Sequence, residues 1–140
     1  MSEPTGPANT YMYELPADPQ SVEKCRTLVH ILVRRWGLYQ QSDLLERMEE
    51  CAALLVEVAV EDSAGGCEPL RVRFGREETQ LRVDVHMYEI AEPGSAGTDV
   101  KAQWERIAAE LVDRATEWGY ETLDAAGRHG WCTLAISIED

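Results

Sequence analysis

The sequence lacks the features that would assign it to a membrane, secreted or zinc-binding class. It contains no run of about 18 consecutive apolar residues, the minimum for a membrane-spanning helix. Its start, MSEPTGPANT, has neither basic residues nor an apolar segment, so we expect no secretory signal and a cytoplasmic protein. The four cysteines are scattered without a Cys-x-x-Cys pair, which argues against structural zinc, and we expect no metal site and free, buried thiols.

Basic residues are also scarce: the chain has 13 Lys+Arg against 26 Asp+Glu and a formal net charge of −13. An acidic surplus of this size repels phosphates, so we expect no nucleic-acid partner. The length of 140 residues and the apolar fraction of 44% are typical of one globular domain. We expect residues 1–9 to form a disordered tail and residues 10–140 to form a single domain.

The spacing of apolar residues predicts an α+β fold with the element order βααββαββ. Asp18 is placed to cap the first helix, Pro19 fits its first position, and Gly37 is placed to end it. We expect strands at 10–15, 70–74, 81–87, 121–123 and 131–138, and helices at 19–36, from 42 or 43 to the loop at 63–69, and 99–118. We expect a flexible loop at 91–99. The order favours a two-layer sandwich with three helices on one face of a mixed, mainly antiparallel sheet.

Three tryptophans, Trp36, Trp104 and Trp118, fall on the apolar faces of the expected helices, where we expect them to pack in the core. Gly119 follows the last of them and is expected to stop the third helix. No catalytic role is expected for these side chains.

The alternation within the strands places Arg82, Asp84 and His86 on the outward side of the expected hairpin. We therefore expect His86 to be exposed rather than to ligate a metal. Trp131 lies on the strand face opposite Leu134, where an exposed aromatic patch would mark an interface.

Four segments together resemble bacterial anti-sigma-factor serine kinases, in the style of actinobacterial members. They are the start LPADPQSVEKCR, the helix end WGL, the hairpin segment LRVDV, and the block ELVDRATEWGYE…GWCTLAISI. These kinases belong to the GHKL superfamily of histidine-kinase-like ATPases. The resemblance extends from Tyr11 to Ile138 and implies a Bergerat-like ATPase fold.

The resemblance also implies three ATP-binding motifs, and this sequence has lost each of them. Leu54 stands where the family has a catalytic Glu, and Val58 stands where it has a Mg²⁺-binding Asn. Met87 occupies the position of the Asp that reads adenine, and the helix opening at Lys101 lacks the glycine-rich turn. Apolar side chains cannot act as bases or bind a hard cation, so we expect no catalytic residue and no cofactor.

The family's remaining activity is protein binding through its first strand and first helix. Arg26 matches a position that contacts the sigma factor or its antagonist, and it forms a basic stripe with His30 and Arg34. Such a stripe fits an acidic partner surface, although a solvated helix face explains it too. We expect solvation for the acidic residues of the second helix, Glu46, Glu49 and Glu50.

The sequence thus predicts a non-catalytic regulatory protein with a degenerate GHKL fold that binds a protein of a sigma-factor or partner-switching pathway. The expected partner is a sigma factor, an anti-sigma antagonist, or a second chain in a homo- or heterodimer, without a membrane. Two alternatives stay open. One is an active anti-sigma serine kinase with a divergent ATP pocket, and the other is a small-molecule sensor that reuses the former nucleotide pocket.

Overall fold

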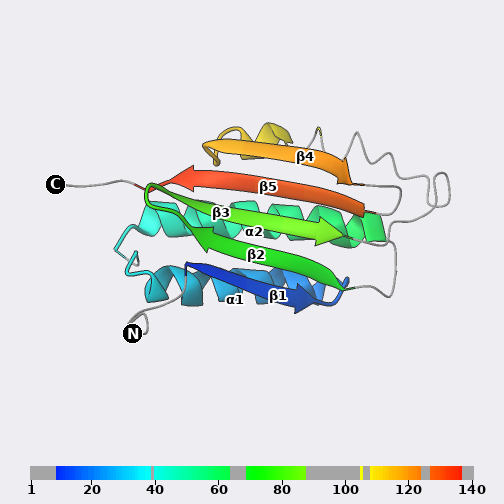
Figure 1. Ribbon diagram of the computed structural model, residues 1–140, viewed down its shortest axis with the longest axis horizontal. Helices are drawn as coiled ribbons and strands as arrows, with labels where there is room; N and C mark the ends of the chain where they lie inside the picture. Colours follow the sequence, from blue (N-terminus) through cyan, green and yellow to red (C-terminus); the bar gives the residue numbers. More distant parts are fainter. Residues whose placement is uncertain are drawn as a thin grey trace, which may run out of the picture.

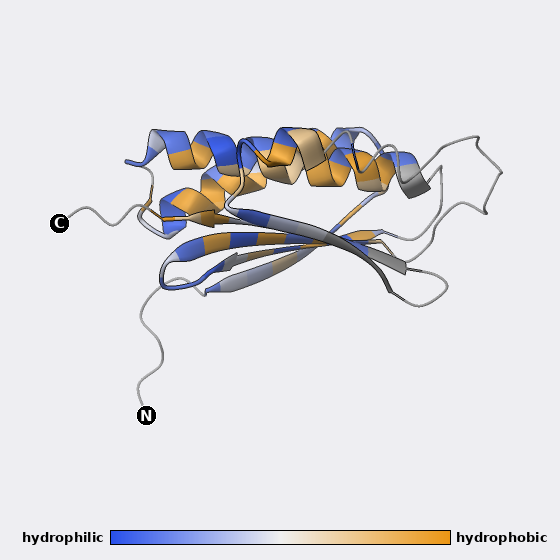
Figure 2. Cartoon of the chain, turned by 90° about the horizontal axis from the view of Figure 1, so that it is seen from above, coloured by the Kyte–Doolittle hydropathy of each residue, from blue (hydrophilic) through white to orange (hydrophobic). Residues whose placement is uncertain are grey.

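Two helices cover one face of a five-stranded sheet in the computed structural model, which describes residues 9–38, 40–63, 69–87, 105, 108–123 and 127–136. The elements in chain order are β1 (Thr10–Leu15), α1 (Gln20–Arg35), α2 (Ser42–Ser63), β2 (Leu70–Arg76), β3 (Gln80–Met87), β4 (Glu117–Leu123) and β5 (Gly127–Ala135). A short helical segment, 108–111, precedes β4. Figure 1 shows the sheet in front of α1 and α2, and Figure 2 shows the two layers from above. The expected α+β class and two-layer arrangement therefore agree with the structure.

The strand order is β1-β2-β3-β5-β4, and each neighbouring pair is antiparallel. The expectation of a mixed sheet is thus wrong for the described strands. The long connection after β3 brings β4 into the sheet parallel to β3, but the hairpin partner β5 lies between them. No two parallel strands therefore become neighbours within the described sheet.

The hydrophobic core lies between the helices and the inner face of the sheet. Alternate residues of β2 and β3, such as Val72, Phe74, Val83 and Val85, are buried there. The apolar stripes of α1 and α2 pack on them with Val29, Leu32, Val33, Met48, Leu55 and Val56. The outer face of the sheet has no helix over it among the described residues (Figure 2).

The end of α1 follows the sequence signal at Gly37, whereas its start lies one residue later than expected, at Gln20, with Pro19 at the N-cap position. The Asp18 carboxylate accepts a hydrogen bond from the Gln20 N–H at 2.9 Å, which satisfies a free donor of the first turn. Gly37 has φ of 74°, a left-handed conformation that glycine adopts without cost, and the chain turns there toward α2. Trp36 is buried in the core, as expected, with its ring centroid 6.1 Å from that of Tyr11.

The three described cysteines, Cys25, Cys51 and Cys132, are free and buried, which confirms the expectation for them. Burial raises the pKa of the Cys25 thiol to about 12, so this side chain is an inert core residue. Cys67 lies outside the described residues.

The prediction that the third helix extends to residue 118 is wrong. Residues 112–114 form a turn, and from Thr116, whose N–H donates to the Thr133 carbonyl, the chain joins the sheet. Trp118 is therefore a strand residue with 38% of its surface exposed, and Gly119 is a strand residue that stops no helix. Pairing with β5 overrides the apolar spacing, and it also extends β5 four residues upstream of the expected start at Trp131.

Several expectations fall on residues that are not described. They are the tail at 1–8, the loop at 91–99, the start of the third helix with Lys101 and Trp104, and the end of the last strand at 137–138. Asn9, placed in the tail, instead extends the sheet, because its carbonyl accepts the Arg76 N–H. Neither described helix is both long and apolar enough to cross a membrane.

Candidate functional site

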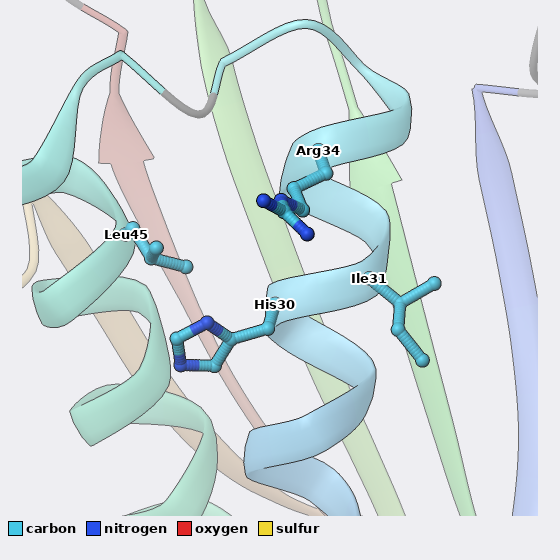
Figure 3. Close-up of a pocket in the computed structure, with 4 residues that line it drawn as sticks. All are labelled: His30, Ile31, Arg34 and Leu45. Atoms are coloured by element: carbon cyan, nitrogen blue, oxygen red, sulfur yellow. The ribbon is translucent and has the colours of Figure 1, made fainter.

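A surface groove of about 470 Å³ runs between α1 and α2. Its lining residues are His30, Ile31, Arg34 and Leu45. Figure 3 shows His30 and Arg34 on the side of α1 that faces α2, with Leu45 pointing back from α2. Two of the three residues expected to bind a partner thus lie in one concave surface.

Glu49 of α2 holds the first part of the basic stripe. Its carboxylate accepts a bond from His30 Nε2 at 2.7 Å and one from Arg26 Nη1 at 3.4 Å. Arg26 also lies 3.5 Å from Glu23 on its own helix. The positive charge of Arg26 is therefore largely balanced within the protein, and the contacts of Arg26 and His30 with Glu49 tie α1 to α2.

Arg34 differs from the other members of the stripe. It is exposed, and within the described part of the chain it forms no ion pair. Ile31 beside it has 44% of its surface exposed, which is high for a large apolar side chain. The groove therefore combines one free cation with exposed apolar surface, a chemistry that suits contact with another protein.

The acidic residues of α2 are not the plain solvated face expected from the sequence. Glu49 is half-buried between the helices, and Glu50 accepts a hydrogen bond from Arg114, which raises the pKa of that guanidinium. Only Glu46, among the three, is an exposed residue. The acidic run thus contributes to the internal electrostatics of the helical layer.

The three positions at which the resemblance would place ATP-binding residues lie along the core. Val58 and Met87 are buried, and Leu54 is half-buried and packed against the same apolar cluster. Their side chains carry no group for proton transfer or metal binding. Among the described residues, no three His, Cys, Asp or Glu side chains come together in a way that could hold a metal ion.

Sequence reasoning missed Ile31, Leu45 and Glu49. Leu45 is half-buried and lines the groove from α2. The spacing of one helix gives no information about which residue of a second helix will face it. The pairing of Glu49 with His30 therefore becomes visible only once the two helices are docked.

No protein-family model matches this chain, and no curated protein matches it either.

Proposed function

We propose that this chain is a non-catalytic regulatory protein with a GHKL-like, Bergerat-type fold that acts by binding another protein in a sigma-factor or partner-switching pathway. The observation that carries the proposal is the groove between α1 and α2, where the free Arg34 lies beside the exposed Ile31. A partner that covers this groove is prevented from using its own contact surface elsewhere. The mechanism is therefore occlusion.

The apolar residues at the former ATP positions support the non-catalytic part of the proposal. A triphosphate with Mg²⁺ needs oxygen ligands and phosphate-binding donors, whereas Val58 and Met87 offer buried hydrocarbon and a thioether. The net charge of −13 adds repulsion toward a polyanion.

Titration of the purified protein with ATP and Mg²⁺ is expected to give no heat of binding in isothermal calorimetry. The reason is that no carboxylate or amide stands at Leu54, Val58 or Met87 to bind the metal or the base. A dissociation constant in the micromolar range would contradict the proposal and favour the active-kinase alternative.

Ile31→Asp combined with Arg34→Glu is expected to weaken partner binding at least about tenfold. Ile31→Asp removes apolar contact surface from the groove, and Arg34→Glu makes the groove repel an acidic partner surface. The partner is first isolated by affinity capture from the native cell, and its affinity for each variant is then measured with purified proteins. Val112→Asp is the matched control, since Val112 has 61% of its surface exposed and lies away from the groove. Equal affinity of all three proteins would show that the groove is not the interface.

A further inference from the structure

Two of the buried cysteines meet in the core between the helical layer and the sheet. Cys51 lies on α2, and Cys132 lies on the inner side of β5, opposite the buried Val83 of β3. Figure 1 shows α2 behind β3 and β5, and both cysteines are 0% exposed within the same apolar cluster. The Cys132 thiol donates a hydrogen bond to the Cys51 sulfur. Two thiols in contact differ chemically from an isolated one, because together they can give up two electrons and form a disulfide.

The surroundings of the two sulfurs are unequal. The hydrogen bond from Cys132 lowers the pKa of Cys51, against the effect of burial. The guanidinium groups of Arg114 and Arg47 act in the same direction as this hydrogen bond, and the Glu50 carboxylate opposes them. The hydrogen bond and burial both raise the pKa of Cys132 well above its usual value. Thiolate character therefore lies on Cys51, and the thiolate is the form of cysteine that reacts with oxidants.

Cys25 provides a comparison within the same core. It is also 0% exposed, and burial raises the pKa of its thiol to about 12, with Arg26 acting in the other direction. Among the described residues, no thiol hydrogen bond acts on Cys25. Burial alone therefore gives an inert cysteine in this protein, and the contact between two thiols is what distinguishes Cys51 and Cys132.

We propose that Cys51 and Cys132 are a redox-sensitive pair, which hydrogen peroxide converts into a disulfide between α2 and β5. The Cys51 thiolate attacks one peroxide oxygen, and the O–O bond breaks. The sulfur becomes a sulfenic acid, and the hydroxide that leaves takes up the proton that Cys51 released on ionising. The Cys132 sulfur then attacks the Cys51 sulfur, the S–O bond breaks, and the hydroxide leaves as water with the thiol proton of Cys132. Two thiols and one peroxide thus give one disulfide and two water molecules.

The path of the oxidant to Cys51 passes a contact at the protein surface. Glu50 precedes Cys51 on α2 and accepts a hydrogen bond from Arg114, and the two side chains are 37% and 36% exposed. Arg114 belongs to the turn at 112–114. Water competes for such an exposed pair, so this turn opens locally more readily than the sheet and admits a molecule as small as hydrogen peroxide.

The test treats the folded, reduced full chain with hydrogen peroxide. Free thiols are then blocked with N-ethylmaleimide during unfolding, and the peptides are mapped by mass spectrometry. We expect a peptide pair linked through Cys51 and Cys132, which dithiothreitol removes. The oxidised chain is expected to unfold at a higher urea concentration than the reduced chain, because the disulfide restricts the unfolded state. Cys25→Ala is the matched control and is expected to leave the yield of the linked peptides unchanged.

Two single variants test the order of the steps. Cys132→Ala is expected to stop the reaction at the sulfenic acid, which dimedone labels at Cys51 when the treated protein is unfolded in its presence. Cys51→Ala is expected to give no label at Cys132, because that thiol keeps its proton. Peptide mapping of the unchanged chain decides whether the pair forms even where a variant fails to fold.

Four results would overturn this inference. They are absence of the link between Cys51 and Cys132 while circular dichroism shows a folded chain, a link through Cys25 or Cys67 instead, a link between two chains, and dimedone label at Cys132 rather than Cys51. The groove between the helices takes no part in these measurements, so failure here leaves the proposed function of the groove intact.

Discussion

Phe74→Ala is expected to lower the free energy of unfolding by about 3–5 kcal/mol, the usual cost of removing a buried phenyl ring. Phe74 is the only phenylalanine of the chain and is fully buried on β2, between β1 and β3. Its ring also makes an edge contact with Tyr13 of β1, with centroids 6.1 Å apart. Urea denaturation followed by circular dichroism measures the change.

Two further variants make this result specific to packing. Phe74→Leu keeps most of the buried hydrocarbon and should lose less than half as much stability as Phe74→Ala. Met12→Ala removes an apolar side chain from β1, where 56% of its surface is exposed, and should change stability by no more than about 0.5 kcal/mol. If the Met12 and Phe74 variants lost equal stability, the assignment of inner and outer sheet faces would be wrong.

The first half of the fold could be predicted from the sequence because its signals are local. The strand at 10–15 has the bounds expected from its alternation. The Asp18 carboxylate binds the N–H of Gln20, the first residue of α1, and Gly37 follows the end of the helix, each within a few residues of the structure it affects. In this part of the chain, neighbouring residues of one element determine the local structure, so it can be predicted without knowing the tertiary contacts.

The segment around Trp118 shows why the rest could not be predicted. Its apolar residues recur at helical spacing, and a glycine follows, so the local pattern fits a helix end. In the structure Gly119 is the strand position on which the Trp131 ring rests. The need for glycine at position 119 comes from Trp131 on another strand. The spacing of residues within one segment gives no information about it.

The residues of the candidate site were also only partly predictable from the sequence. The stripe of Arg26, His30 and Arg34 follows from a spacing of four on one helix, and the side chains do share a face. Which of them remains available to a partner depends on α2, because Glu49 pairs with Arg26 and His30 and not with Arg34.

On the uncovered sheet face, the sequence predicted the outward placement of Arg82, Asp84 and His86. The expectation that His86 is exposed is wrong, since it is half-buried against His129.

Asp84→Ala is expected to lower the free energy of unfolding by about 3 kcal/mol, the lower end of the range for breaking a buried ion pair. The substitution removes the acceptor of the Arg82 hydrogen bonds and the partner of His129, and His129 is itself only 7% exposed. Arg82 keeps partial access to water, with 34% of its side chain exposed, which places the cost at the lower end. Urea denaturation provides the measurement.

Glu14→Ala is the matched control, because it breaks an arginine–carboxylate pair on the same face of the same sheet. The Arg71 and Glu14 side chains are 50% and 59% exposed, so water replaces their contact and the expected loss is below about 1 kcal/mol. Equal losses in the two variants would contradict the burial of Asp84. A large loss only at Asp84 would mean that the fold depends on this cluster, which also fixes the positions of Arg82 and Trp131.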